Sequence, residues 1–159
     1  MTASTPLRPM TPPEFAAWRA AAIPRYAAGK VASGQWTQAD ALALSAAEYD
    51  ALLPHGLATP EQHFHMIVDA HGAPVGTLWF AVKAKFGEPI AYVFDVHVDD
   101  ARRRRGHARA AFIGLEAEAR RLGLRGVALQ VFGQNAAGRA LYAGLGYEPT
   151  NLSLYKAVG

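Results

Sequence analysis

The sequence predicts an α/β (α+β) protein, and three stretches carry this prediction. Residues 91–122 run from a block of apolar and β-branched residues through a glycine-containing turn into a segment with one apolar helical face. A strand-turn-strand pattern precedes this stretch at residues 63–84, and residues 127–146 read as a strand followed by a helix. Strands that alternate with helices in this way are expected to form one sheet flanked by helices.

Composition narrows the class of protein. The chain has 159 residues, of which 51% are hydrophobic and 18% are charged, so we expect one globular domain spanning residues 1–159. The absence of cysteine excludes disulfides, thiolate metal sites and a cysteine nucleophile. A polar, proline-rich start and the lack of a long apolar run predict a cytoplasmic protein without a membrane partner.

The first half of the chain predicts an edge strand and two helices. Residues 5–10 suit a short edge strand because their prolines limit ladder bonds. Thr11 and Glu14 have the spacing of a capping box, which begins a helix over 13–28, although Pro24 makes its second half doubtful. A second helix is expected from Thr37, with Asp40 three residues later as its capping partner.

The first strand of the hairpin carries two histidines. His63 and His65 are two residues apart on a strand, so their side chains are expected to face the same side. Such a pair suits a metal or a substrate, but the sequence shows no third ligand, and we therefore predict no metal site. The last residues, 152–158, alternate enough to predict a closing strand.

An arginine-rich turn joins the central strand to its helix. A glycine turn at a helix start leaves backbone N–H groups unpaired at the positive end of the helix dipole, which suits a phosphate. The spacing Arg103-x-x-Gly106-x-Ala108 adds two residues without bulk, so a pyrophosphate can approach the backbone. Taken alone, the four arginines are more typical of a solvated basic turn.

This loop resembles the pyrophosphate loop of the GCN5-related N-acetyltransferases, the GNAT family. A second segment of the family pattern follows at the expected distance and has a similar Leu-Gly-aromatic ending. Its matching residues are Asn135, Leu141, Tyr142, Leu145, Gly146 and Tyr147. The resemblance covers residues 90–147 well, and the first half of the chain in the order of its elements.

The resemblance implies a mixed, mostly antiparallel sheet, splayed between two parallel strands at 90–98 and 127–132 and flanked by helices. Acetyl-CoA would enter the split as co-substrate, with its pantetheine on strand backbone and its pyrophosphate on the loop. The cofactor-binding residues implied in this way are Val96, His97, Val98, Arg103, Arg104, Arg105, Gly106, His107, Ala108, Arg109 and Asn135.

The implied activity is transfer of the acetyl group to a primary amine of a small molecule or peptide by direct attack. Tyr142 is the implied catalytic residue, donating a proton to the leaving thiolate, and its alternative role is an ordinary packed aromatic. The base stays unassigned, since Gln130 stands where some members carry a Glu. Its candidates are Asp95, His97, His63, His65 and water.

Two other functions remain open on the sequence. A noncatalytic acyl-CoA-binding or sensing domain would also keep the loop, although the presence of Tyr142 favours the enzyme. A basic nucleic-acid-binding module is weaker, because the net charge is only +3 and no motif that reads DNA or RNA accompanies the arginines. The acceptor amine is not readable from the sequence, and a homodimer is left open.

Overall fold

The computed structural model describes residues 5–159, which form two compact units divided between Leu129 and Gln130. The first unit contains the sheet and the helices α1, α2 and α3. The second contains α4 and the C-terminal segment. Within residues 5–159, no helix combines the length and the apolar composition needed to cross a bilayer.

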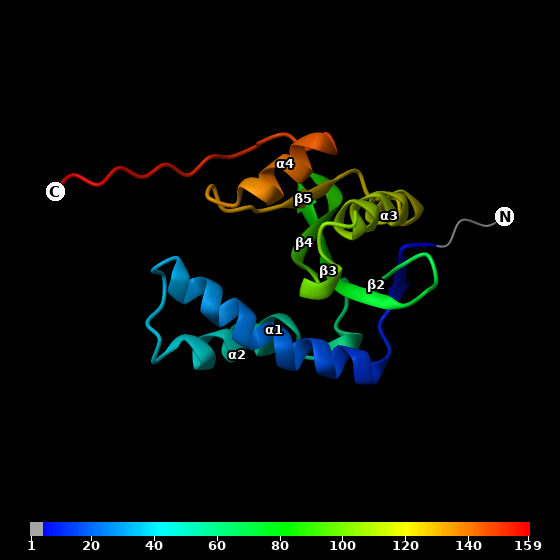
Figure 1. Cartoon of the computed structure of the whole chain (residues 1–159), viewed down its shortest axis with the longest axis horizontal. Helices are drawn as coiled ribbons and strands as arrows, with labels where there is room; N and C mark the ends of the chain where they lie inside the picture. The colour runs from blue at the N-terminus through cyan, green and yellow to red at the C-terminus, as the bar shows by residue number, and fades with distance from the viewer. Residues whose placement is uncertain (1–4) are drawn as a thin grey trace. The chain divides into compact units, whose positions relative to one another are not determined.

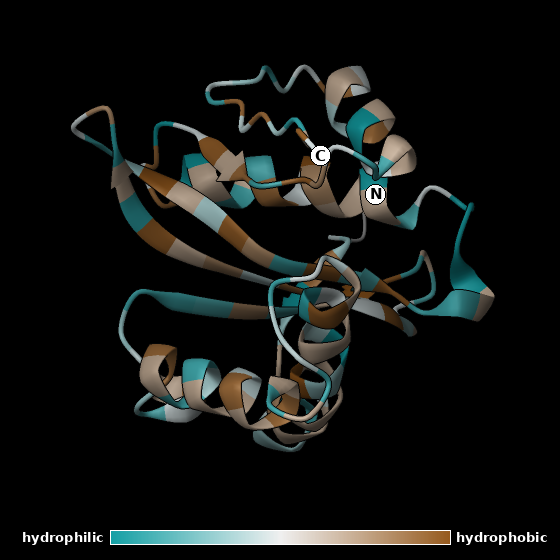
Figure 2. Cartoon of the chain, turned by 90° about the vertical axis from the view of Figure 1, so that its left-hand side faces the viewer, coloured by the Kyte–Doolittle hydropathy of each residue, from teal (hydrophilic) through white to brown (hydrophobic). Residues whose placement is uncertain are grey.

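The sheet has five strands in chain order, and its bounds are β1 Leu7–Pro9, β2 Gln62–Val68, β3 Pro74–Lys85, β4 Glu88–Val98 and β5 Val127–Leu129. Neighbours pair antiparallel except β4 and β5, which are parallel. Apolar and polar segments alternate along the long strands, as half-buried strands require (Figure 2). The predicted mixed sheet, its hairpin and its N-terminal edge strand are confirmed.

The parallel pair is short. β4 and β5 pair only from Ala91 with Val127 to Val93 with Leu129, so β5 ends three residues before the predicted 132. β4 continues to Val98 with β3 on one side. Among the described residues, no strand pairs with 94–98 on the other side, and this half of β4 therefore has an open edge.

Helices cover both faces of this sheet (Figure 1). α1, Pro12–Ala32, and α2, Ala41–Leu52, lie on one face, and α3, His107–Arg121, lies on the other. The predicted capping box is present: Glu14 N–H donates to Thr11 Oγ1 at 3.4 Å, and Thr11 N–H donates to Glu14 Oε1 at 2.9 Å. α1 thus begins where the sequence predicts.

α1 continues past Pro24 and past the predicted residue 28. Proline removes one backbone donor, but Ala22 and Ala27 on either side of it are both buried, and Ser45 Oγ of α2 donates to Ile23 O at 2.8 Å. Packing against α2 and the sheet thus outweighs the lost helix bond. The predicted Thr37–Asp40 contact is present at 2.9 Å, but it closes a turn, and α2 begins after it.

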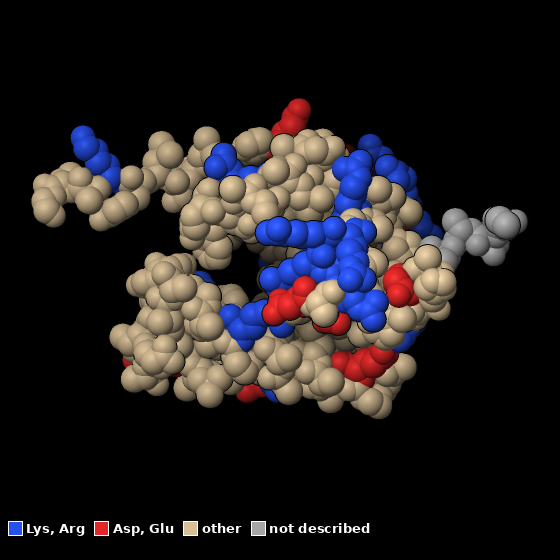
Figure 3. All heavy atoms as spheres, in the orientation of Figure 1, with Lys and Arg blue, Asp and Glu red and all other residues tan. Residues whose placement is uncertain are grey.

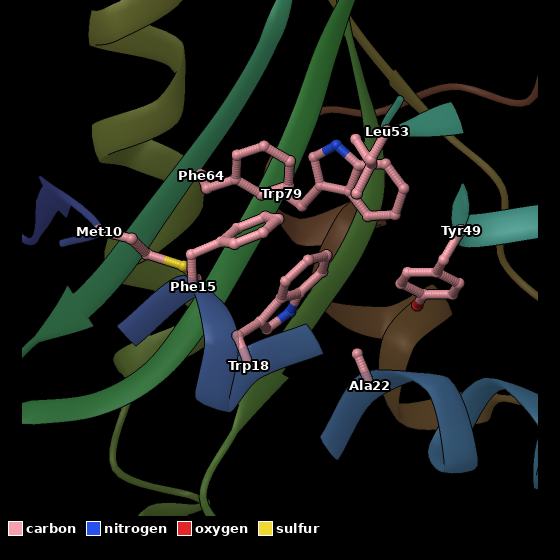
Figure 4. Close-up of a cluster of buried hydrophobic side chains, with 8 residues drawn as sticks. All are labelled: Met10, Phe15, Trp18, Ala22, Tyr49, Leu53, Phe64 and Trp79. Carbon is pink, nitrogen blue, oxygen red and sulfur yellow. The ribbon is translucent and has the colours of Figure 1, made fainter. Parts of the chain in front are cut away.

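A cluster of aromatic and aliphatic side chains fills the space between α1, α2 and the sheet (Figure 4). Its buried members are Met10, Phe15, Trp18, Ala22, Tyr49, Leu53, Phe64 and Trp79. The Trp18 ring meets Trp79 nearly edge-on at 5.4 Å, and Phe15 meets Phe64 in the same way at 4.9 Å. These geometries are favoured by aromatic quadrupoles, so the cluster holds α1 in one orientation on the strands.

A β-bulge interrupts the β3–β4 ladder between Trp79 and Phe80. Trp79 pairs with Asp95 and Phe80 pairs with Val93, which leaves Phe94 as the extra residue. Phe94 stacks on Trp79 at 4.5 Å and so lies toward the α1 side. The prediction that Phe94 faces away from Asp95 is therefore wrong, because strict alternation ends at a bulge.

The second unit contains α4, Ala136–Gly144, with the predicted cap: Gly138 N–H donates to Asn135 Oδ1 at 2.9 Å. Gly146 adopts φ 91° just after the helix, the left-handed conformation expected there. The predicted closing strand at 152–158 is wrong. That segment has no regular structure, and Leu154 and Tyr155 are 91% and 92% exposed. Alternation alone does not make a strand without an edge to pair with.

The close approach of β3 to β4 gives a stability prediction. A Cβ at Gly76 would lie 2.2 Å from His97 O, so we expect Gly76→Ala to destabilise the protein by about 1–3 kcal/mol. Gly29→Ala is the matched control, because Gly29 lies in α1 with nothing within 4 Å of the added Cβ. Gly29→Ala should stabilise by about 0.5–1 kcal/mol. Urea unfolding measures both, and equal changes would contradict this account.

Candidate active site

The loop after β4 presents backbone donors to solvent. It passes through a short 3-10 turn, Asp100–Arg102, and reaches Gly106, whose φ of 81° favours glycine. No side chain caps α3, so the N–H groups of its first turn have no partner within the helix. A Cβ at Gly106 would meet nothing within 4 Å. Open space, free donors and nearby arginines fit a pyrophosphate group.

The arginines of the run do not all have the same role. Arg103 Nε donates to Val98 O at 3.1 Å, and Arg103 also pairs with Asp100 at 3.0 Å. Arg103 therefore ties the loop to the end of β4. Arg104, Arg105 and Arg109 are exposed, and no ion pair in the described part of the chain engages them. Lys and Arg atoms gather beside α3, with a few Asp and Glu atoms at the border (Figure 3).

The open edge of β4 is the second part of the site. Asp99 N–H donates to Val75 O at 2.9 Å, and backbone direction alternates along an antiparallel pair. The register therefore directs His97 backbone toward β3 and directs Val96 and Val98 backbone toward the open edge. Of the three residues predicted to pair with pantetheine, Val96 and Val98 have this geometry, with Val98 O already accepting from Arg103.

The face of β4 toward α1 carries a charged pair. Asp95 Oδ2 accepts from Arg25 at 2.8 Å and from Trp18 Nε1 at 3.2 Å, and the Asp95 side chain is 20% exposed. The prediction that Asp95 faces a helix is thus confirmed. Sequence reasoning missed both α1 partners. Their spacing of seven residues, which places Trp18 and Arg25 on one helical face, was the available signal.

His97 lies on the same face as Asp95, because the two residues are two positions apart on β4 and the bulge comes before both. Burial lowers the pKa of His97; Arg25 and Arg103 lower it further, whereas Asp95 and Asp99 raise it. The imidazole is therefore neutral at pH 7. Thr77 is its cross-strand partner, and Thr77 Oγ1 is buried with no hydrogen-bond partner among the described residues.

His63 and His65 lie on the other face of the sheet, as a pair. Their rings stack parallel to Phe80 at 4.7 Å and 5.7 Å, and Glu118 and Arg121 of α3 influence both electrostatically. The prediction that the two histidines share a side is confirmed. Within residues 5–159, no group of three or more His, Cys, Asp or Glu residues is arranged to hold a metal ion.

The second unit contains the remaining predicted residues. The Tyr142 ring lies 5.9 Å from the Tyr147 ring, and burial raises the pKa of the Tyr142 phenol, which is therefore protonated at pH 7. Asn135 uses its side-chain oxygen as the cap of α4. Gln130 lies outside β5, at the first position of this unit.

Comparison with known proteins identifies the family to which this chain belongs. The sequence model of the Acetyltransferase (GNAT) family matches residues 30–147, and the chain belongs to this family. It is 32% identical over 150 residues to the uncharacterized N-acetyltransferase YycN of Bacillus subtilis, covering 94% of this chain and 96% of the relative. YdgE of the same organism, also named an uncharacterized N-acetyltransferase, is 31% identical with the same coverage.

Solved structures agree with the fold. The crystal structure of YycN superposes with a TM-score of 0.88, covering 96% of this chain and 97% of that one at 32% identity. AAC(6')-Iy in complex with the bisubstrate analogue CoA-S-monomethyl-acetylneamine superposes with a TM-score of 0.62 at 16% identity, covering 96% and 97% of the two chains. The latter likeness supports the fold alone.

The buried histidines give a pH prediction. Burial is the main cause that lowers the pKa of His63 and His65 below the ordinary 6.5, so the folded state disfavours their protonated forms. The unfolded chain binds these protons first. The contribution of these neutral imidazoles to the free energy of unfolding should therefore be fully present above pH 6.5. It should be lost as the pH drops below 6.5, by at most about 1.4 kcal/mol per pH unit for each imidazole.

Urea unfolding between pH 7.5 and 5.5 measures this slope. His65→Leu removes the more buried imidazole, which is 8% exposed, and should make the slope shallower. His71→Gln is the control, because His71 is exposed in the β2–β3 turn, and it should keep the wild-type slope. An unchanged slope in His65→Leu would contradict the assignment.

Proposed function

We propose that this protein transfers the acetyl group of acetyl-CoA to a primary amine of a small molecule or peptide, by direct attack of the amine. The observation that carries the proposal is the uncapped start of α3 beside the open half of β4. The two features together offer donors for phosphates and an unpaired strand edge for an extended chain of amides. Family membership supports acetyl-CoA as the donor.

The chain's own residues divide the binding work. In this proposal, first-turn N–H groups of α3 and the free side chains of Arg104, Arg105 and Arg109 bind the pyrophosphate. Val96 and Val98 hold the pantetheine amides as a neighbouring strand would. Gly106 keeps the loop conformation that aims the donors outward. AAC(6')-Iy, a protein of the same fold, binds an analogue that contains CoA.

The chemistry requires two proton movements. The amine nitrogen forms a bond to the thioester carbonyl carbon, the carbon–sulfur bond breaks, and the nitrogen must lose a proton while the sulfur gains one. We assign donation to sulfur to the Tyr142 hydroxyl, on the family motif that joins Asn135 to Tyr142. A protonated phenol, which the raised pKa of Tyr142 ensures at pH 7, is the form that can donate.

Phosphate contacts give a binding prediction. By calorimetry, wild-type protein should bind CoA, and Arg104→Ala and Arg105→Ala should each weaken that binding roughly three- to tenfold. A pantetheine fragment without the pyrophosphate should bind these variants as it binds wild type. Arg121→Ala is the matched control, because it removes the same charge about 20 Å away at the other end of α3.

Three outcomes would count against the binding proposal. Equal losses for CoA and pantetheine would argue against phosphate contact. A failure to bind CoA or acetyl-CoA at millimolar concentration would exclude acetyl-CoA as the co-substrate. Salt-sensitive binding of random DNA without CoA binding would favour a nucleic-acid module instead.

The proposed role of Tyr142 gives a kinetic prediction. Tyr142→Phe keeps the ring and removes the donor, so turnover should fall by roughly ten- to a thousandfold with little change in acetyl-CoA affinity. Release of free thiol from acetyl-CoA with a panel of primary amines measures it. Tyr155→Phe, at an exposed position, is the control.

Two results would contradict this role. Turnover within twofold of wild type, with chemistry rate-limiting, would exclude Tyr142 as the donor. Wild-type protein that binds acetyl-CoA but releases no thiol with any amine would indicate a noncatalytic acyl-CoA-binding domain.

A further inference from the structure

In the proposed reaction the amine must lose a proton, and no residue has yet been assigned as the base that accepts it. The geometry narrows the candidates that the sequence left open. Gln130 is not a base. His63 and His65 lie under α3, on the face of the sheet away from Asp95. Asp95 accepts hydrogen bonds through Oδ2 from Arg25 and Trp18 of α1, so this oxygen is already engaged.

His97 differs from these candidates in its position on β4. Its flanking residues Val96 and Val98 direct their backbone to the open edge, where the pantetheine is proposed to lie. The His97 side chain projects from the same strand toward the α1 side. A chain added to the open edge would lie one strand spacing, about 4.8 Å, from β4. The imidazole therefore lies on the α1 face of the strand along which the pantetheine is proposed to extend.

A neighbouring side chain on β3 supports a polar group on the α1 face of the sheet, beside His97. Thr77, directly across from His97, has a buried Oγ1 without a partner in the described chain. Buried hydroxyls are usually hydrogen-bonded, so this one is available to a water or to a polar group of a ligand. Gly76, next to Thr77, allows the β3 backbone to approach His97 O. The two strands thus hold Thr77 and His97 close together.

We propose that His97 is the general base of the reaction, taking the proton from the attacking amine at a ring nitrogen. This inference rests on the proposed acetyl transfer. The nitrogen–carbon bond forms, the carbon–sulfur bond breaks, the amine proton passes to the imidazole, and the imidazolium returns it to water. The sulfur receives its proton separately from Tyr142, and water then reprotonates the Tyr142 phenolate.

The charged groups around His97 make it suited to this task. Burial, Arg25 of α1 and Arg103 of the loop lower its pKa, while Asp95 and Asp99 raise it. The balance keeps the ring neutral and able to accept a proton at pH 7. The Arg25–Asp95 pair thus adjusts the pKa of His97, since its two members act on it with opposite signs.

The first test is His97→Gln, which keeps the backbone and a polar side chain but removes the base. Thiol release from acetyl-CoA is followed with the best amine of the panel, or with water as acceptor where no amine reacts. We expect kcat/KM to fall by roughly ten- to a thousandfold at pH 7.5, and the acidic limb of the pH profile to disappear. CoA affinity by calorimetry should stay near wild type. His71→Gln should leave rate and profile unchanged.

The second test uses a pair of variants with opposite expected shifts. Arg25→Gln removes a positive neighbour and should move the acidic limb to higher pH, whereas Asp95→Asn should move it to lower pH. A merely structural role predicts lower stability in both variants without opposite shifts. Circular dichroism identifies variants that do not fold, and the His97→Gln result then decides alone.

The outcomes separate the two proposals. Turnover of His97→Gln within twofold of wild type, with the acidic limb retained, overturns the role of His97 and leaves acetyl transfer standing. A wild-type protein that binds acetyl-CoA and releases no thiol, with amines or with water, overturns both. If His97→Gln weakens CoA binding and lowers kcat/KM by the same factor, His97 acts in cofactor binding, and its role as the general base is overturned.

Discussion

The incomplete pairing of β4 is the constraint on which the rest of the site depends. β3 pairs with β4 from Glu88 to Val98 except at the bulge, whereas β5 pairs with it only at three positions. A half-paired central strand leaves strong backbone donors and acceptors at an edge inside a sheet. The chain retains this edge beside the uncapped start of α3. Backbone groups without a partner in regular secondary structure therefore lie at two neighbouring places, the edge of β4 and the start of α3.

The bulge and the aromatic cluster decide what surrounds that edge. Because Phe94 is the extra residue, Asp95 and His97 stay in phase with Trp79 and Thr77, and their side chains point toward α1. The Trp18–Trp79 contact at 5.4 Å holds α1 against this face, which brings Arg25 to Asp95. The core therefore fixes the position of a charged pair. Loosening the cluster would move charges as well as apolar surface.

Local rules predicted most of the elements, and contacts between distant segments account for the misses. The capping box at Thr11, the Asn135 cap and the glycine turn at Gly106 need only neighbouring residues, and each is present as predicted. The persistence of α1 through Pro24 depends on α2 and the sheet. The pattern of 152–158 predicted a strand, but the sequence does not reveal whether an edge is available. The bulge at Phe94 depends on how two strands register, which periodicity within one strand does not contain.

Arg103 links the two parts of the proposed site. The family pattern marks it as a loop residue, but its guanidinium bonds to Val98 O, one residue beyond His97, and its charge lowers the pKa of His97. A phosphate near the loop would offset part of that positive charge. This change would raise the pKa of His97 and make the imidazole a stronger base. In the proposed reaction, binding of acetyl-CoA and the basicity of His97 would therefore be coupled through Arg103.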